Sequence, residues 1–438
     1  MPTEYCLLSN GQGRRIAGIV GLLCITGLVA SLVAQEQKPA APVKPPAVDS
    51  NRVPTVPTDL HYIDTGFENG SPLWYEIEPD NLIRIHLIYD HERDAPNRAV
   101  LHFHFKLHAK PGSKLTLEFD NLDNVWNRMK SRVSGEMKLA VVSVDGKTWE
   151  PMPMQRLVEE NKSRLTVEMP GPTLTVSRIE PYLPSHLESM LAKVGQHPLG
   201  EVKIVGNTVE GRPLEIVRLG KEDAPYRVFL RARAHPWESG GNWVLQGLVD
   251  KLLSGDETAK KALEHYCVYS LPMANKDGVV RGRSRFNLRG KDLNRNWDLP
   301  SDPDLAPENF ALEKWLEGQI AAGKKPHLAL ELHNDGNGKL HVSRPSIQNG
   351  DRHVERMKVF EELLRAHTWF REGSTISAGG GGTLGSGWLM RYGIDGAVHE
   401  FNCNWLEGAQ DFPSRKHWGD YGANLVTVFD EYFAAVKP

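Results

Sequence analysis

The hydrophobic pattern of the chain changes near residue 185, and this change limits the folds that the chain can adopt. Before that point, apolar and polar residues alternate with period two in short runs, which is typical of half-buried strands. The clearest such runs are residues 83–87, 101–107 and 114–119. Turn-forming residues separate them. We therefore predict an antiparallel β-sandwich domain over residues 58–178, with one face of its sheets turned to solvent.

After residue 185, short apolar runs alternate with helical patterns. A Ser185-His186-Leu187-Glu188 capping box predicts the start of the first helix. Further helical patterns cover residues 242–253, 307–320, 354–368 and 421–436. Alternation of this kind predicts a three-layer α/β/α domain with a mostly parallel mixed sheet over residues 179–438.

The N-terminal segment has the composition of a leader. Arg14 and Arg15 precede an uncharged run over residues 16–34, which is 19 residues long. Such a run is typical of a signal peptide and is also long enough to cross a bilayer. We predict that residues 1–34 are a signal peptide or an N-terminal anchor and that the protein is exported, periplasmic or extracellular. Residues 35–57 contain six prolines and are predicted to form an extended linker.

Charge and cysteine content exclude some classes of protein. The 52 basic and 55 acidic residues give a net charge of −3, which argues against a general nucleic-acid-binding protein. Four cysteines in 438 residues exclude a disulfide scaffold. Cys6 and Cys24 lie in the leader, while Cys267 and Cys403 are either a pair or two buried thiols. With 17 histidines, metal binding is expected to rest on imidazole and carboxylate groups.

Two short motifs follow predicted strands of the α/β domain. The first contains His235 and Glu238, three residues apart, and the second is Glu331-Leu332-His333-Asn334. His and Glu are suitable ligands for Zn²⁺, and a catalytic zinc has three protein ligands and one open position. Because ligands gather at the carboxyl ends of strands in open α/β sheets, His235, Glu238 and His333 are the predicted metal ligands. Taken alone, H-x-x-E occurs by chance in many chains, and His333 could be an ordinary core histidine.

Other histidines are interpreted as structural. His86, His102, His104 and His108 recur along the predicted strands of the β-sandwich. We expect them to lie on the polar faces of amphipathic strands and to bind no metal.

Two further segments carry charged groups suited to catalysis. Residues 281–295 hold six basic side chains and one acidic one, a net charge of +5. Guanidinium groups bind carboxylates and stabilise oxyanions, although a solvated basic loop would have the same composition. Glu400 follows an apolar run in Ala397-Val398-His399-Glu400-Phe401 and is the predicted general base. The helical H-E-x-x-H zinc motif is absent from the sequence.

Together these motifs resemble the zinc carboxypeptidases of the M14 type, and most closely the cytosolic-carboxypeptidase-like, deglutamylase-related branch. The resemblance covers roughly residues 60–430 and includes the P-M-x-N-x-D-G segment from Pro272 and the D-L-N-R-N-W segment from Asp292. It implies that one zinc ion is held by the three ligands named above. It also implies that Asn294 and Arg295 bind the C-terminal carboxylate of a substrate, that Arg285 polarises the scissile carbonyl, and that Glu400 activates water. One departure is that residues 373–388 contain no counterpart of the family's mobile tyrosine.

The sequence thus predicts a zinc-dependent metallocarboxypeptidase that hydrolyses C-terminal residues from peptides or proteins. The basic segment favours substrates with acidic C-termini. Two alternatives stay open: an exported zinc amidase or carboxypeptidase that trims peptidoglycan stem peptides, and a catalytically inactive binding protein. No nucleic-acid partner is expected, and membrane contact is expected only through an uncleaved N-terminal segment.

Overall fold

The computed structural model describes residues 56–91, 97–347, 349–378 and 382–436, and the described residues lie in one compact unit. The predicted leader, residues 1–34, and almost all of the predicted linker, residues 35–57, lie outside the described residues. No described helix is both long enough and apolar enough to cross a membrane. The predicted domain boundaries stay predictions.

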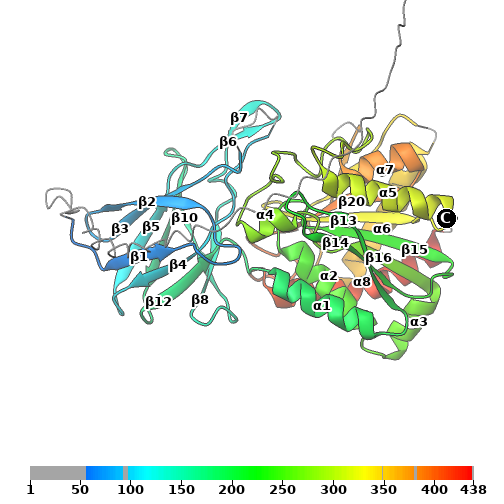
Figure 1. The fold of residues 1–438 in the computed structure, drawn as a ribbon, viewed down its shortest axis with the longest axis horizontal. Coiled ribbons are helices and arrows are strands. Elements are labelled where there is room, and N and C mark those ends of the chain that lie inside the picture. Colours follow the sequence, from blue (N-terminus) through cyan, green and yellow to red (C-terminus); the bar gives the residue numbers. More distant parts are fainter. Residues whose placement is uncertain (1–55, 92–96, 348, 379–381, 437–438) are drawn as a thin grey trace, which may run out of the picture. The chain divides into compact units, whose positions relative to one another are not determined.

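The first part of the chain forms two five-stranded sheets, with strand orders β1-β4-β12-β8-β9 and β10-β11-β5-β3-β2 (Figure 1). All of their pairings are antiparallel except that of β3 with β5. A separate hairpin of β6 and β7 projects from them. The strands are β1 (Leu60–Asp64), β2 (Leu73–Glu78), β3 (Leu82–Leu87), β4 (His104–Ala109), β5 (Lys114–Phe119), β6 (Asp123–Trp126), β7 (Met129–Arg132), β8 (Leu139–Ser143), β9 (Glu150–Pro153), β10 (Gln155–Leu157), β11 (Lys162–Glu168) and β12 (Thr173–Ser177).

The second part is an eight-stranded mixed sheet of order β13-β14-β16-β15-β17-β20-β18-β19 with helices on both faces (Figure 1). Its central strands β16, β15, β17 and β20 are parallel. The strands are β13 (Gly200–Asn207), β14 (Pro213–Leu219), β15 (Tyr226–Ala232), β16 (Tyr266–Leu271), β17 (Leu328–Asp335), β18 (Leu340–Ser343), β19 (Ser374–Ser377) and β20 (Asp395–Asn402). The helices are α1 (Pro184–Gln196), α2 (Gly240–Leu252), α3 (Glu257–His265), α4 (Lys276–Val280), α5 (Pro307–Ala321), α6 (Gly350–His367), α7 (Leu384–Tyr392) and α8 (Arg415–Ala435).

Strand β15 shows how the sheet is covered on both sides. Val228 and Leu230 point to a core shared with α2 and α8, whereas Phe229 points to a second core that contains Trp315 of α5 and Trp388 of α7. Both faces are buried, which explains why the central strands read as nearly continuous apolar runs. The prediction of an α/β/α domain preceded by an antiparallel β-sandwich is confirmed.

Several local predictions differ from the structure. The helix α1 begins at Pro184, and Nδ1 of His186 accepts a hydrogen bond from the backbone N–H of Leu183. The predicted capping box of Ser185 and Glu188 is therefore wrong, because Pro184 fixes φ and starts the helix earlier. Cys267 and Cys403 are both buried and unpaired.

The histidines of the β-sandwich are not all on a polar face. His102 and His104 are buried, while His86 and His108 are partly exposed. Among the residues that the structure describes, none of the four belongs to a group that could hold a metal ion. The prediction of surface positions is thus wrong for His102 and His104, which are covered where the loop at Asn69 packs on β4.

Candidate metal centre and catalytic site

The proposed site residues lie at the carboxyl ends of three neighbouring parallel strands. β17 pairs with β15 on one side and with β20 on the other, and His333 of β17 lies in register with Glu400 of β20. His235 comes three residues after the end of β15. Because parallel strands end at the same edge of a sheet, residues 98 and 67 positions apart in the chain meet there.

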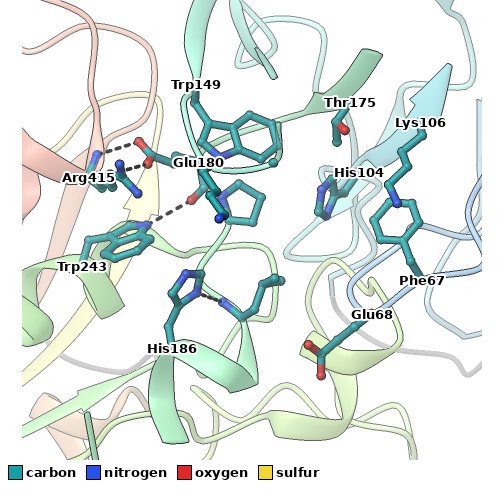
Figure 2. Close-up of a pocket in the computed structure, with 14 residues that line it drawn as sticks. Phe67, Glu68, His104, Lys106, Trp149, Thr175, Glu180, His186, Trp243 and Arg415 are labelled. Atoms are coloured by element: carbon teal, nitrogen blue, oxygen red, sulfur yellow. Dashed lines mark hydrogen bonds and ion pairs between the residues drawn. The ribbon is translucent and has the colours of Figure 1, made fainter. Parts of the chain in front are cut away.

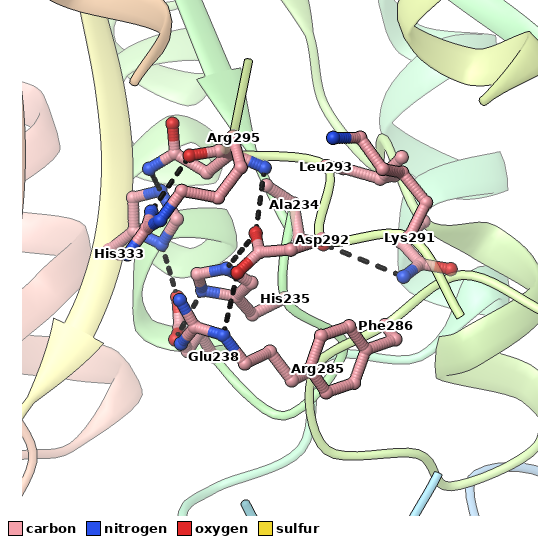
Figure 3. A network of polar contacts seen from close by, with 12 residues as sticks. Ala234, His235, Glu238, Arg285, Phe286, Lys291, Asp292, Leu293, Arg295 and His333 are labelled. Carbon is pink, nitrogen blue, oxygen red and sulfur yellow. Dashed lines mark hydrogen bonds and ion pairs between the residues drawn. The ribbon is translucent and has the colours of Figure 1, made fainter. Parts of the chain in front are cut away.

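His235, Glu238 and His333 form a buried cluster whose possible ligand atoms all lie within 4.8 Å of one another (Figure 3). Oε1 of Glu238 lies 2.8 Å from Nδ1 of His235, and Oε2 lies 2.5 Å from Nδ1 of His333. The two imidazole rings have centroids 4.6 Å apart. Two nitrogen donors and one carboxylate in this arrangement fit the ligand set of a catalytic zinc.

The far nitrogen of each imidazole is also held. Nε2 of His235 lies 3.1 Å from Oδ1 of Asp292, and Nε2 of His333 lies 3.2 Å from Oε1 of Glu331. Glu331 is itself paired with the buried Arg231. At His235, an Nε2–H donated to Asp292 leaves Nδ1 unprotonated and aimed at the cluster, which is the orientation that a histidine ligand needs.

The charges of this cluster depend on one another. Burial raises the pKa of the Glu238 carboxyl, but His235 and His333 beside it outweigh burial and hold that pKa well below its usual range. Burial lowers the pKa of His333, but the nearby carboxylates of Glu238 and Glu331 outweigh this and raise it well above its ordinary value. A buried carboxylate-rich site that attracts positive charge is suited to a cation.

Two arginines approach the cluster from the basic segment. Nε of Arg285 donates to Oδ2 of Asp292 over 2.8 Å, and Arg285 is 6% exposed. Burial lowers the pKa of Arg295, a residue that is only partly exposed. Both guanidinium groups lie over the ring of Trp126, at 4.9 and 5.7 Å from its centre. Trp126 belongs to the β6–β7 hairpin, so the β-sandwich contributes a side chain to this site.

The β-sandwich also positions the backbone beside Arg285. The carboxylate of Asp90 accepts hydrogen bonds from the backbone N–H groups of Ser284, Arg285 and Phe286, over 2.8, 2.5 and 2.9 Å. Three donors from consecutive residues fix the path of this loop, and with it the direction in which Arg285 leaves the backbone.

Asn294, which is predicted to bind a substrate carboxylate, is held by other parts of the protein. It is buried, and its Oδ1 accepts a hydrogen bond from the backbone N–H of Leu384 over 3.0 Å. Its Nδ2 lies 3.0 Å from Nε2 of His333. Both polar atoms of the amide therefore face other groups of the protein, whereas Arg295 is partly exposed.

Glu400 lies beside the cluster on the wall of a cavity of about 330 Å³ that Arg285, Glu238 and Trp126 also line. Its Oε2 is buried and has no hydrogen-bond partner among the described residues. Burial first, and then the charge of Asp335, raise the pKa of Glu400 well above the ordinary value. Glu400 also lies with Asp335 and His341 in a second group that could hold a cation, but His341 is exposed.

Comparison with known proteins identifies the second part of the chain. Residues 187–404 match the family model described as zinc carboxypeptidase. The chain therefore contains a zinc carboxypeptidase domain. The predicted family and zinc, the metal named in its description, are thus confirmed.

Curated relatives support the predicted branch. The chain is 39% identical to human cytosolic carboxypeptidase 1 over 115 residues, which are 26% of this chain and 9% of the relative. It is 29% identical to cytosolic carboxypeptidase 6 of Caenorhabditis elegans over 199 residues, which are 41% of this chain and 43% of the relative. The chain thus spans less than half the length of these relatives.

Solved structures support the fold. A metallo-carboxypeptidase from Burkholderia cenocepacia has a TM-score of 0.73 and 21% identity, over 85% of this chain and 99% of that chain. A metallo-carboxypeptidase from Pseudomonas aeruginosa has a TM-score of 0.70 and 22% identity, over 85% of this chain and all of that chain. The similarity extends beyond the matched domain and therefore includes much of the β-sandwich.

The comparisons correct the predicted location. The relatives are named cytosolic carboxypeptidases, so the prediction of an exported protein, periplasmic or extracellular, is wrong. Membrane contact through residues 16–34 is likewise unsupported, and that segment lies outside the described residues. A basic pair followed by an apolar run has the composition of a leader, but composition alone does not fix a compartment.

Sequence reasoning missed four residues of this site: Asp292, Glu331, Trp126 and Asp90. Asp292 and Glu331 flank predicted site residues in the chain, so their proximity to the ligands was a usable signal. Trp126 and Asp90 reach the site from the β-sandwich, more than 150 residues before Arg285, and no local pattern connects them to it.

Proposed function

We propose that the protein is a zinc-dependent carboxypeptidase that removes residues one at a time from the C-terminus of peptides or proteins. The observation that carries this proposal is the buried cluster of His235, Glu238 and His333 with Glu400 on the adjacent strand. Bound there, zinc would supply a Lewis acid and would lower the pKa of the attacking water.

The chain's own residues would do the rest. Glu400 would take the proton of the attacking water and pass it to the leaving amine. Arg285, whose guanidinium is oriented by Asp292 and Trp126, would donate hydrogen bonds to the carbonyl oxygen as negative charge develops on it. Arg295 would bind the terminal carboxylate of the substrate and so restrict cleavage to chain ends.

A finer part of the proposal concerns the residue released. The net charge of +5 in residues 281–295, taken alone, favours a preference for acidic C-termini. Several of these cations are already engaged, however: Arg281 with Glu210, Arg283 with backbone carbonyls, and Arg285 with Asp292. We therefore propose that the segment recognises the terminal carboxylate that all peptides share. Cleavage rates for peptides that end in Glu and in Leu should then agree within about tenfold, a difference of roughly 1.4 kcal/mol.

The test uses one peptide in two forms, with a free C-terminal carboxylate and with a C-terminal amide. Mass spectrometry follows the products with and without a chelator. We expect stepwise loss of C-terminal residues from the free acid only, and no loss in the chelator. Internal cleavage, equal cleavage of the amide, or cleavage that survives the chelator would contradict the proposal.

A further inference from the structure

A second pocket lies between β4 and the start of α1 (Figure 2). Its volume is about 230 Å³. Aromatic rings of Phe67, Trp149 and Trp243 form much of its wall. Nε1 of Trp243 donates to the backbone oxygen of Glu180, so this side chain offers the pocket its ring and no free donor. None of the predicted catalytic residues lines this pocket.

His104 gives the pocket a hydrogen-bond acceptor. Nδ2 of Asn69 donates to the backbone oxygen of Val279, so Oδ1 of Asn69 is the atom that faces Nδ1 of His104, 3.0 Å away. Since that oxygen can only accept, Nδ1 of His104 carries the proton and Nε2 is left as an acceptor. Burial, together with the nearby charge of Lys106, lowers the pKa of His104 to about 4, so the ring is neutral. His104 is 4% exposed, and no described residue hydrogen-bonds to its Nε2.

Lys106 gives the pocket a positive charge. Its ammonium group lies 4.5 Å from the centre of the Phe67 ring, and none of the described carboxylates forms an ion pair with it. His104 and Lys106 are two positions apart on β4, so both side chains are on the same face of the sheet, about 7 Å apart. The pocket thus presents a neutral acceptor and a cation side by side above an aromatic wall.

This arrangement complements an α-amino acid. In a free amino acid the ammonium group is a donor, the carboxylate is an anion, and both are attached to one carbon atom. The aromatic wall would cover an apolar side chain. We propose that this pocket binds a free α-amino acid with an apolar side chain, with its carboxylate on Lys106 and its ammonium group on Nε2 of His104. Because a carboxypeptidase releases free amino acids, the ligand would be a product of the reaction. Its identity as a product rests on the proposed function, whereas the binding itself does not.

The pocket is also connected to the candidate metal centre. The backbone oxygen of Glu180 accepts hydrogen bonds from Trp243 on the pocket wall and from Oγ of Ser239, over 3.2 and 2.6 Å. Ser239 is the residue after Glu238. A ligand in the pocket would therefore contact Glu180, which is hydrogen-bonded to the residue that follows a proposed metal ligand.

The binding test is a calorimetric titration of the full-length protein with L-phenylalanine, in the absence of any peptide substrate. We expect saturable binding that Lys106→Met weakens at least about tenfold, since hydrogen bonds to charged groups contribute that much. Lys110→Met, which changes an exposed lysine at the end of the same strand, should leave binding unchanged. Phenylalaninamide lacks the carboxylate and N-acetylphenylalanine lacks the ammonium group, so both should bind at least about tenfold more weakly.

A further variant separates the pocket from the candidate catalytic site. Arg295→Met should retain L-phenylalanine binding, because Arg295 does not line the pocket. The proposal is overturned if binding is absent in the millimolar range, if Lys106→Met binds like the parent, or if Arg295→Met removes binding. None of these results bears on peptide cleavage, which is measured separately.

Discussion

Two pairs of buried histidines, one in each part of the molecule, differ in what surrounds them. His102 and His104 in the β-sandwich face the amide residue Asn69, and their pKa values are lowered to about 3 and about 4, first by burial. His235 and His333 in the α/β domain face carboxylates, and the pKa of His333 is raised. Both pairs are buried, so burial does not explain the difference. The neighbouring carboxylates make the pair His235 and His333 suited to a cation, whereas His102 and His104 lack such neighbours and are neutral.

The largest effect is expected when the shared carboxylate is removed. Glu238→Gln keeps the size of the side chain but replaces the charge that joins His235 to His333. We predict that this variant purifies without stoichiometric zinc and has no measurable turnover, because a catalytic zinc needs three protein ligands. Metal analysis and peptide cleavage check this. Glu118→Gln, a buried carboxylate of the β-sandwich, is the matched control and should keep its zinc; equal loss in both variants would contradict the account.

The Glu400→Gln variant tests whether Glu400 is a metal ligand or only a carboxylate near the metal. Glu400 is partly buried beside the cluster, with its Oε2 buried, but it is not one of the three members. We predict that the variant keeps its zinc and that its kcat falls about 10²- to 10⁴-fold, the usual contribution of a general base. If the variant also loses its zinc, Glu400 is itself a metal ligand, and its assignment as the general base alone is wrong.

Asp292→Asn makes the surroundings of His235 resemble those of His104, with an amide in place of a carboxylate. We predict that zinc affinity falls about 10- to 100-fold, as is typical when the partner of a histidine ligand is changed. Competition with a zinc indicator measures this. Unchanged zinc affinity would show that the Asp292 carboxylate beside His235 does not strengthen zinc binding.

Trp126→Ala tests whether the β-sandwich takes part in the reaction. The guanidinium groups of Arg285 and Arg295 lie over this ring, and such contacts contribute about 0.5–2 kcal/mol. We predict that kcat/KM decreases roughly 2- to 30-fold while zinc content is unchanged. Trp74→Ala, which removes an exposed tryptophan on β2, should have no effect. A Trp126 variant that cleaves like the parent would restrict the β-sandwich to a structural role.

The smallest effect is expected from the histidines of the β-sandwich, and it concerns the pH dependence of folding stability. In the unfolded chain His102 binds a proton near pH 6.5, whereas in the folded chain its pKa is about 3. The unfolded state therefore takes up more protons as the pH falls from 6.5 towards 3, and stability decreases over that range.

Urea unfolding midpoints at several pH values should show this slope, and His102→Gln should make it shallower. His61→Gln changes an exposed histidine and should leave the slope unchanged; an unaltered slope in His102→Gln would show that this ring is charged in the folded protein.

The parts of the site that could be predicted are those encoded within a few residues. H-x-x-E follows the apolar strand β15, and the Glu331–Asn334 run forms the last part of β17, so their side chains had to lie at one edge of a parallel sheet. Trp126 and Asp90 could not be predicted, because they reach Arg285 through tertiary contacts from another sheet. The neutral state of His104 depends in the same way on the distant Asn69.

The helix α7 shows a similar limit in the fold. Its sequence, Leu-Gly-Ser-Gly-Trp-Leu-Met-Arg-Tyr, contains two glycines that lower its helix propensity. A Cβ atom on Gly387 would lie 2.3 Å from the backbone of Trp297, and one on Gly385 would lie 3.1 Å from the backbone of Ala397. The glycines thus permit close packing of α7 on its neighbours. That requirement comes from the tertiary structure and leaves no periodic signal in the sequence.

The most direct test of the central claim is anomalous X-ray scattering from crystals of the purified protein, recorded on both sides of the zinc absorption edge. We predict a single zinc peak within bonding distance of Nδ1 of His235, Nδ1 of His333 and the carboxylate of Glu238. A peak at Asp335 and His341 instead, or a crystal grown with zinc that shows no peak between the three residues, would contradict it.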